Sequence, residues 1–402
     1  MHTPKSVTDR RRFLKVMGLA PLPLLLPPLA MAAGKSGGTP VPAEGNEDTL
    51  INFVSDDVML SPRAYLKKLG EIDAATPIEP DFYGQGGATQ ALEEAFAKLT
   101  GKPAAIYVPT GTLANQLALK LLCGENTKAL VPENSHIYRD EADAAQSVHG
   151  LRPVPAGTGK PYFTRADLEQ TIAYHDAGEV FHSGWGAIAV ENPIRRADGT
   201  AIPLDTLKDI AALAREKGYK MHLDGARIHI AAACTGVPIS EYASLFDTVY
   251  ISLYKYLNAA GGAILCGPAD LIDKMRHHIK IRGGTTFQTW TNSAMALHAL
   301  NGIEERWKNV ANAATRLVAG LNKLEGVHIT PVENGTNIYN LVLDPSISLK
   351  KLAGILYDEH NMWVGRANEQ GTVKLTVNES LLRQPVDVIV TVWRSALAKA
   401  KK

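Results

Sequence analysis

The 402-residue chain has almost no net charge, and this absence argues against two kinds of partner. Its lysine and arginine residues outnumber its acidic residues by one, which gives a formal net charge of +1 at pH 7. Such a balance supplies no basic field for nucleic acid and no acidic tail. Hydrophobic residues make up 45% and charged residues 21% of the chain, the shares of an ordinary globular protein. The length corresponds to roughly two to three domains.

Cysteine is also scarce. The three cysteines, Cys123, Cys234 and Cys266, are odd in number and lie in apolar stretches with helix-like or strand-like patterns. Proteins that fold in an oxidising compartment often use disulfides. The pattern therefore favours a chain that folds where its thiols stay reduced.

The chain lacks a hydrophobic run that is long and unbroken enough for a membrane-spanning helix. The apolar segment near the amino terminus is short and interrupted by four prolines. The sequence "RRRFLK" (10–15) before it resembles a twin-arginine export signal, and "AMA" (30–32) fits an A-x-A cleavage site. We expect a signal peptide over residues 1–32, cleaved near Ala32, and a folded protein that is periplasmic or secreted. An uncleaved anchor is the alternative.

The remainder of the chain predicts a linker and two domains. Residues 33–49 are rich in glycine, proline and serine and predict a flexible linker. Helix-like and strand-like segments then alternate over residues 50–305, which is typical of an α/β domain whose mostly parallel sheet is flanked by helices. Residues 306–402 predict a smaller α+β domain. The stretch 293–326 reads as one long helical segment across that boundary.

Three short segments carry chemistry, and each has an ordinary structural alternative. Pro109-Thr110-Gly111-Thr112 follows a strand-like run and precedes a helix, so it suits either an anion or a simple N-cap. Asp224 ends a buried strand and needs a cation or a hydrogen-bond donor, which Arg227 could supply. Lys255 lies in a nearly continuous apolar run, where a lysine becomes neutral or reactive unless it reaches solvent.

Metal and nucleotide sites are disfavoured by the sequence. His222 and Asp224 fall on one strand face, but His229 is expected to lie in the next helix, so these three are a poor ligand set, and we expect no metal. "GWGAIA" (184–189) fits a dinucleotide-binding pattern, but it precedes its strand and opens no helix. No P-loop and no H-E-x-x-H motif occurs in the sequence.

Taken together, the three segments match the needs of pyridoxal phosphate. A helix N-terminus anchors the phosphate, an acid keeps the pyridine nitrogen protonated, and a lysine holds the aldehyde as an imine. Each segment alone is ambiguous. Their order along an alternating α/β sequence is what predicts this cofactor.

The chain from about Leu50 to its end resembles the threonine aldolase and β-eliminating lyase family of fold-type-I pyridoxal-phosphate enzymes. The resemblance covers most of that region in order and spacing. It is carried by "INFVSDDV", "FYGQGGATQALEEAFAKLTGKPAAIYVPTGTLANQ", "NSHIYRDE", "AVENP", "HLDGARIHIAAA", "FDTVYISLYKYLNAAGGAILCG" and "IRGGTTFQTWTNSAMALHAL".

The resemblance implies a role for each matching residue. Lys255 would carry the cofactor covalently, Asp224 would pair with the pyridinium, and His136 would lie against the ring near the substrate. The remaining implied cofactor-binding residues are Thr110, Gly111, Thr112, Glu191, Asn192 and Arg227. The implied substrate-binding residues are Ser55, Tyr83, Arg227, Arg366 and Lys374, with Tyr83 reaching a neighbouring subunit of a homodimer or homotetramer with shared active sites.

The chain departs from the family pattern mainly on the substrate side. Ile194 stands where the aldolases usually carry a histidine, and Lys374 stands where a carboxylate-binding arginine is expected. Lysine lacks the bidentate fork of arginine, for which Arg366 could compensate. Phe287 replaces a common arginine, although Lys280 and Arg282 could still contact a phosphate, and Tyr254 replaces a usual serine.

The resemblance implies retro-aldol cleavage of a β-hydroxy-α-amino acid, such as L-threonine or L-allo-threonine, to glycine and an aldehyde. The altered substrate side leaves β-elimination, transaldol transfer and racemisation open on the same cofactor. A non-catalytic periplasmic binding protein is a further alternative, against which the retention of Lys255 and Asp224 argues. The expected partner in every case is a small-molecule amino-acid substrate.

Overall fold

The computed structural model describes residues 49–58 and 60–402. The expected signal peptide and nearly all of the expected linker lie outside the described residues. No helix in the described part of the chain is long and apolar enough to cross a membrane. The described residues belong to one compact unit, Ala43–Lys402.

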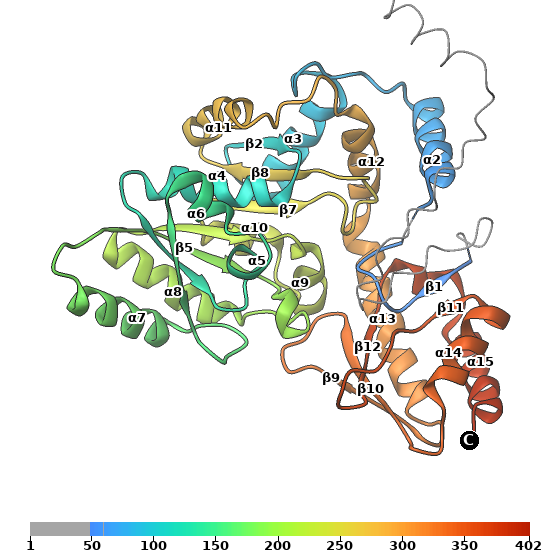
Figure 1. Ribbon diagram of the computed structural model, residues 1–402. Helices are drawn as coiled ribbons and strands as arrows, with labels where there is room; N and C mark the ends of the chain where they lie inside the picture. The colour runs from blue at the N-terminus through green and yellow to red at the C-terminus, as the bar shows by residue number, and fades with distance from the viewer. Residues whose placement is uncertain (1–48, 59) are drawn as a thin grey trace, which may run out of the picture. The chain divides into compact units, whose positions relative to one another are not determined.

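A seven-stranded sheet and the helices that flank it form the larger part of this unit (Figure 1). Its strand order is β2-β8-β7-β6-β5-β3-β4, and only β8 runs antiparallel to its neighbours. The strands are β2 (Ala104–Val108), β3 (Lys128–Pro132), β4 (Arg152–Ala156), β5 (Trp185–Glu191), β6 (Lys220–Asp224), β7 (Thr248–Ser252) and β8 (Ala263–Gly267). The expected α/β class with a mostly parallel sheet is confirmed.

Helices cover both faces of this sheet because its central strands are apolar on both sides. Every residue of β5 is buried, and alternate residues join different hydrophobic clusters, Ile188 and Val190 in one, Ala187 and Ala189 in another. The helices of this region are α2 (Pro62–Ala75), α3 (Gly87–Thr100), α4 (Gly111–Cys123), α5 (His136–Arg139), α6 (Ala144–His149), α7 (Arg165–Gly178), η1 (Arg195–Ala197), α8 (Leu204–Lys217), α9 (Ile228–Thr235), α10 (Ile239–Ser244), α11 (Ala269–Ile281) and α12 (Trp290–Leu300).

A three-stranded antiparallel sheet, ordered β12-β10-β9, forms the carboxy-terminal region with three helices. A short parallel pair, β1 with β11, ties the start of the described chain to this region. The elements are β1 (Ile51–Asn52), α13 (Ile303–Leu321), β9 (Val327–Pro331), β10 (Ile338–Leu343), α14 (Leu349–His360), β11 (Met362–Trp363), β12 (Val373–Thr376), η2 (Glu379–Arg383) and α15 (Val386–Lys399). The predicted boundary at 305/306 falls inside α13 and stays a prediction.

The expectation of one continuous helical segment over 293–326 was wrong. The structure ends α12 at Leu300 and starts α13 at Ile303. Gly302 between them has φ of 69°, a left-handed conformation that does not continue a right-handed helix. A glycine within a helical pattern is a weak stop signal in sequence, and here it separates two helices.

Candidate active site

Three strand ends bring the predicted cofactor residues to one edge of the large sheet. β2 leads through Pro109 into α4, β6 ends at Asp224, and β7 leads into the turn that carries Lys255. Because β6 and β7 are parallel neighbours, with Asp224 paired to Tyr250, their carboxyl ends meet. Open α/β sheets bind ligands at this edge.

The start of α4 has the features of an anion site. Thr110 is the N-cap, and its Oγ1 accepts a hydrogen bond of 3.1 Å from the backbone N–H of Leu113. At Gly111 an added Cβ would lie 2.1 Å from the Tyr250 hydroxyl, so only glycine fits this close approach. Ser252 at the end of β7 is 1% exposed, and its hydroxyl has no partner among the described residues. Free donors near a helix N-terminus fit a phosphate.

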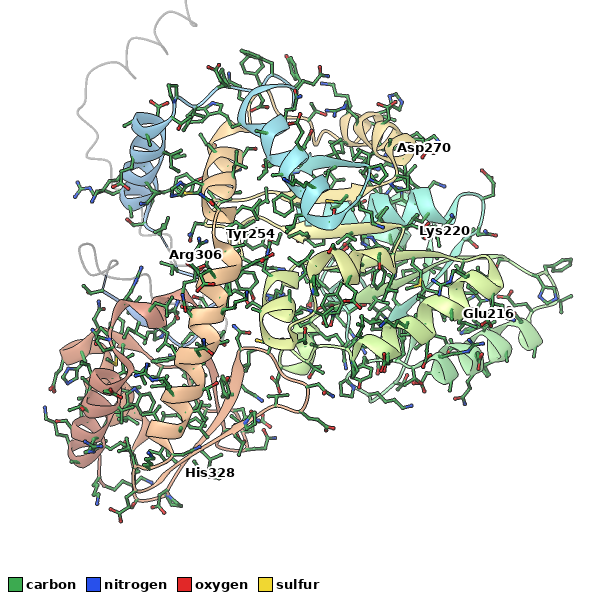
Figure 2. All side chains as sticks on the ribbon, turned by 180° about the vertical axis from the view of Figure 1, so that it is seen from behind. Glu216, Lys220, Tyr254, Asp270, Arg306 and His328 are labelled. Atoms are coloured by element: carbon green, nitrogen blue, oxygen red, sulfur yellow. The ribbon has the colours of Figure 1, made fainter. Side chains whose placement is uncertain are left out.

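Lys255, which the sequence predicts to be the reactive amine, is buried. Its exposed fraction is 7%. Burial and the neighbouring Arg227 charge lower its pKa to about 8, while nearby carboxylates oppose that shift. Its Nζ lies 5.7 Å from the ring centroid of Tyr254, a half-exposed residue labelled in Figure 2. A buried amine with a lowered pKa is partly neutral near neutral pH, which suits imine formation with an aldehyde.

Asp224 is held by two hydrogen bonds. Its Oδ1 accepts from the backbone N–H of Ala226 at 3.1 Å, and its Oδ2 accepts from Nδ2 of Asn115 at 2.9 Å. The residue is 3% exposed. Arg227, its sequence-based alternative partner, pairs elsewhere, so Asp224 remains available to a cationic ring nitrogen.

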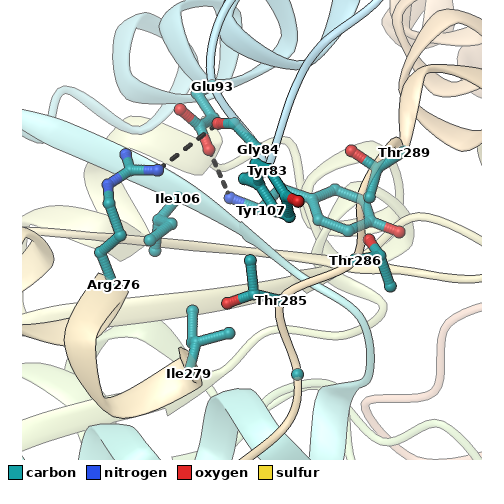
Figure 3. Close-up of a pocket in the computed structure, with 11 residues that line it drawn as sticks. Tyr83, Gly84, Glu93, Ile106, Tyr107, Arg276, Ile279, Thr285, Thr286 and Thr289 are labelled. Atoms are coloured by element: carbon teal, nitrogen blue, oxygen red, sulfur yellow. Dashed lines mark hydrogen bonds between the residues drawn. The ribbon is translucent and has the colours of Figure 1, made fainter. Parts of the chain in front are cut away.

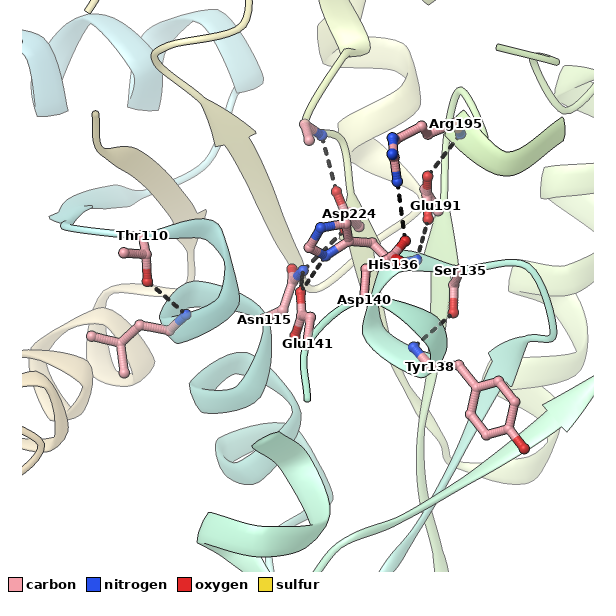
Figure 4. A network of polar contacts seen from close by, with 12 residues as sticks. Thr110, Asn115, Ser135, His136, Tyr138, Asp140, Glu141, Glu191, Arg195 and Asp224 are labelled. Atoms are coloured by element: carbon pink, nitrogen blue, oxygen red, sulfur yellow. Dashed lines mark hydrogen bonds and ion pairs between the residues drawn. The ribbon is translucent and has the colours of Figure 1, made fainter. Parts of the chain in front are cut away.

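His136 begins α5 and is fixed by two carboxylates (Figure 4). Its backbone N–H donates to Oε2 of Glu191 at 2.6 Å, and its Nδ1 lies 2.9 Å from Oε1 of Glu141. The hydrogen bond to Glu141 raises the pKa of His136, and burial works against that shift. Burial and the nearby Asp224 raise the pKa of Glu191. The imidazole is 31% exposed, whereas the Glu141 side chain is 2% exposed.

Arg227 forms an ion pair that the sequence analysis did not predict. Its Nε and Nη2 donate to the two oxygens of Asp56 at 2.9 and 2.8 Å. Tyr256 adds a hydroxyl donor to Asp56 at 3.3 Å. Burial works to raise the pKa of Asp56, but Arg227 lowers it below its ordinary value overall. A substrate carboxylate would therefore meet an arginine that already has an internal partner.

Lys374 and Arg366 are the other cationic residues predicted to bind substrate. They differ in their partners and in their exposure to solvent. Nζ of Lys374 donates to Asp198 at 2.7 Å and to Asn340 at 2.6 Å. Arg366 is exposed in the segment between β11 and β12. The structure thus gives Lys374 an acidic partner and leaves Arg366 on the surface.

Ser55 lies in the turn after β1, where its hydroxyl donates to the backbone oxygen of Asp57 at 2.9 Å. It also contacts the amide of Asn52. Burial raises the pKa of Asp57 to about 8. The predicted carboxylate-binding serine is therefore engaged in a local turn beside the Arg227–Asp56 pair.

Tyr83 lies apart from these residues, beside a small pocket of about 30 Å³ (Figure 3). Its ring is 54% exposed and packs edge-on against Phe287, with centroids 5.4 Å apart. In the same pocket, Oε1 of Glu93 accepts from the backbone of Tyr107 at 2.7 Å, and burial raises the pKa of Glu93 to about 7. An exposed aromatic at this place suits contact with another chain.

Arg282, considered for phosphate contact, is also engaged. It donates to ring nitrogens of His149 at 3.0 Å and of His278 at 3.5 Å. Lys280 lies with its Nζ 5.4 Å from the ring centroid of Tyr83. Both cations therefore have partners within the chain.

The metal set considered from the sequence is not brought together. Both ring nitrogens of His222 are taken, by Thr248 and Asn115. A different trio, His136, Glu141 and Asp224, offers atoms within 4.8 Å of one another. In that trio the Asn115 amide donates to both carboxylates, and Nδ1 of His136 is bonded to Glu141, so the three residues already have hydrogen-bond partners.

The hydrogen-bonding roles of three buried residues that hold the site, Asn115, Glu141 and His222, were not predicted from the sequence. Asn115 follows Gly111 by four residues, so both lie on the sheet-facing side of α4. Glu141 lies within a quoted motif, and His222 precedes Asp224 by two residues on the same strand face. These spacings were the available signals, and they carry little information without the fold.

Comparison with known proteins gives one consistent result. The family model for beta-eliminating lyase matches residues 66–343. The chain is 34% identical over 256 residues to the low-specificity L-threonine aldolase of Candida albicans, covering 63% of this chain and 67% of that protein.

Solved structures show the same fold. A crystal structure from Exiguobacterium sp. 255-15 superposes with a TM-score of 0.73 at 24% identity, covering 87% of this chain and 98% of that chain. The threonine aldolase of Leishmania major superposes with a TM-score of 0.67 at 22% identity, covering 86% and 99% of the two chains.

Proposed function

Because the chain belongs to the β-eliminating lyase family, we propose that its reaction is retro-aldol cleavage of a β-hydroxy-α-amino acid. L-Threonine and L-allo-threonine are the expected examples, with glycine and acetaldehyde as products. The chain is a lyase of the kind that depends on pyridoxal phosphate. The observation that supports this proposal most is that a buried amine, Lys255, and a buried acid, Asp224, lie at one sheet edge, close enough for their charges to interact.

The residues present fit this cofactor. The start of α4, with Gly111 against Tyr250 and the partnerless hydroxyl of Ser252, would receive the phosphate. Asp224 would pair with the ring nitrogen, and Lys255 would hold the aldehyde carbon. When bound, the cofactor supplies an electron-withdrawing ring that stabilises negative charge at Cα of an amino acid.

The remaining work of the reaction falls to side chains of this chain. His136 has its Nδ1 on Glu141, so its Nε2 is the nitrogen able to accept the proton of the substrate's β-hydroxyl, directly or through water. Arg227 would orient the substrate carboxylate in exchange for part of its contact with Asp56. Orientation selects the reaction, because the bond that breaks must lie perpendicular to the cofactor ring.

β-Elimination is the second candidate reaction. The hydrogen bonds that Lys374 makes within the chain support it as an alternative. With Nζ committed to Asp198 and Asn340, this lysine offers a weaker carboxylate clamp than the expected arginine. A looser clamp would allow a different substrate bond to align with the cofactor. Transaldol transfer and racemisation would use the same residues.

An amino-acid panel on the purified protein, with products identified by mass, tests the proposal. Aldehyde and glycine from threonine or allo-threonine are expected. Pyruvate and ammonia from serine, with no aldehyde from threonine, would instead indicate β-elimination. If no amino acid shifts the cofactor's absorbance or gives a product, the remaining interpretation is a non-catalytic binding protein.

We also propose export by the twin-arginine route, which rests on residues 10–15 and the A-x-A site at 30–32. The expected result is a mature periplasmic or secreted protein that begins near residue 33, as determined by N-terminal sequencing after cell fractionation. Replacing Arg10 and Arg11 by lysine should retain the precursor in the cytoplasm. A precursor that is exported equally well after this change would contradict the proposal.

A homo-oligomer is proposed from the exposed aromatic group Phe82, Tyr83 and Phe287, whose side chains are 52%, 54% and 57% exposed. Such a cluster is typical of an interface between chains. Light scattering should give at least twice the monomer mass. A Tyr83→Glu change should lower that mass, and a monomeric unmodified protein would contradict the proposal.

A further inference from the structure

Asn115 lies at the centre of a buried chain of hydrogen bonds in the candidate active site (Figure 4). Its Nδ2 donates to Oε1 of Glu141 at 2.7 Å and to Oδ2 of Asp224 at 2.9 Å. Its Oδ1 lies 3.0 Å from Nε2 of His222, whose Nδ1 lies 2.8 Å from the hydroxyl of Thr248. None of these five residues is more than 5% exposed.

The fold explains why these groups meet. His222 of β6 and Thr248 of β7 are paired in register, so their side chains lie next to each other on one face of the sheet. Asp224 lies two residues after His222 and shares that face. Asn115 lies one helical turn after Gly111, where α4 approaches the sheet closely enough that no Cβ fits.

The direction of each hydrogen bond follows from the chemistry of the groups. The two amide hydrogens of Asn115 go to two carboxylates, so its oxygen must accept from Nε2–H of His222. Nδ1 of His222 then accepts from the Thr248 hydroxyl. Burial lowers the pKa of His222 to about 4, so this histidine is neutral and can hold that tautomer.

Glu141 and Asp224 are two acids served by the same amide nitrogen. Burial raises the pKa of Glu141, and the hydrogen bonds from His136 and Asn115 partly oppose that rise. Without the amide, Glu141 would face Asp224 with one donor fewer, and its pKa would rise further. A protonated Glu141 could donate to Nδ1 of His136 and reverse its tautomer.

We propose that Asn115 is a positioning residue that holds the carboxylates of Glu141 and Asp224 in place through its amide and, through Glu141, fixes His136 with a proton on Nδ1 and a free Nε2. This arrangement prepares His136 to accept a proton from the substrate, a last step that rests on the proposed function. His136 is the member of this network that opens to solvent, with 31% of its side chain exposed. The buried residues act on the substrate through it.

Nuclear magnetic resonance of protein labelled with ¹⁵N-histidine tests the proposal without substrate. Asn115→Leu removes both donors at similar volume, and Glu141→Gln removes the charge with little change of shape. Both changes are expected to lower the pKa of His136, by about one unit for Glu141→Gln. The other charged groups near His136 are retained in both variants: Asp140, Glu191, Asp224 and Lys255.

Asn337→Leu is a matched control, because Asn337 is also buried and donates from Nδ2 to a backbone oxygen in the small sheet. It should lower thermal stability without moving the His136 signals. Asn115→Leu should also move the neutral His136 away from the Nδ1–H tautomer and lower kcat about tenfold at nearly constant KM.

A His136 pKa and tautomer unchanged in both Asn115→Leu and Glu141→Gln would overturn the proposal. A fall in stability alone would then describe a structural asparagine. If the histidine responds as expected but the unmodified protein cleaves no amino acid, the network stands and the proposed function fails. The spectroscopic and kinetic results therefore separate the two claims.

Discussion

The cofactor side and the substrate side of the candidate active site differ in how their charges are arranged. On the cofactor side Lys255 and Asp224 are at most 7% exposed, and the hydrogen bonds to Asp224 come from neutral N–H groups. On the substrate side Arg227 and Lys374 each face an aspartate within 2.8 Å. The first region keeps its charges available to a ligand, and the second has them already neutralised.

This difference indicates which part of the reaction is fixed by the fold. The cofactor residues lie on strand ends and on α4, whose positions follow from sheet register. The substrate residues lie in loops and at the edge of the small sheet, where the partly exposed Lys374–Asp198 pair contributes little free energy. Substrate choice should therefore be easier to alter by mutation than cofactor binding.

Loss of the buried amine should have the largest effect. Lys255→Ala removes the group expected to hold the cofactor, so kcat/KM for cleavage should fall by about 10³-fold or more. Steady-state assays with added pyridoxal phosphate measure this. Lys274→Ala, a change of an exposed lysine on α11, should keep most of the activity, and equal losses in the two variants would remove the distinction between them.

Loss of the buried acid should have the next largest effect. Asp224→Ala leaves the cofactor's ring nitrogen without its anion, so kcat should fall by about 10²-fold and cofactor affinity should drop. Cofactor titration and initial rates measure both. A loss smaller than about threefold would mean that the acid acts structurally.

Arg227→Lys tests the substrate side. It replaces a bidentate fork by a single ammonium group, so KM should rise about tenfold with a smaller change in kcat. Asp56→Asn should lower KM, because it removes the charged carboxylate that competes with the substrate for Arg227. If neither variant changes KM, the substrate carboxylate binds elsewhere.

Reconstitution with cofactor should depend on pH through Lys255. Its pKa is lowered to about 8, so the reactive neutral amine increases as the pH rises through that value. The rate at which cofactor-free protein binds pyridoxal phosphate should rise about tenfold between pH 7 and pH 9 and then level off. Stopped-flow absorbance measures this, and a rate that rises about tenfold between pH 8 and pH 9 would indicate an ordinary lysine.

Lys374→Ala should have the smallest effect. Because Asp198 already neutralises this lysine, its removal should change KM by less than about threefold. Kinetics with the same amino acids measure this. A rise in KM comparable to that of Arg227→Lys would show that Lys374 leaves Asp198 to bind substrate.

Sequence patterns were sufficient for the large sheet and for the residues at its strand ends. Alternation of apolar strands and amphipathic helices is a local property, and so is the placement of Thr110, Asp224 and Lys255 after apolar runs. The partners of these residues were not local. Asn115 meets Asp224 across 109 residues, and Arg227 meets Asp56 across 171 residues, so no spacing in the sequence announces either contact.

The incorrect helix prediction and the unpredicted hydrogen-bond partners both concern features that local sequence patterns do not define. The stretch 293–326 was read as one helical segment because a single glycine weakens a helical pattern without defining a break, and the left-handed Gly302 is visible only in the structure. The sequence placed His222 on the strand face of Asp224 and argued against a metal there, but its two hydrogen-bond partners, on β7 and α4, were not predicted. Local composition cannot assign partners that the topology supplies.

Chemical reduction of the cofactor-loaded protein tests the central claim most directly. Borohydride converts an imine between a lysine and pyridoxal phosphate into a stable amine, and peptide mass spectrometry then locates the modified residue. We predict that Lys255 carries the label. Prior incubation with an amino acid that the protein cleaves should lower the amount of label on Lys255. A label on another lysine, or none in protein saturated with the cofactor, would contradict this prediction.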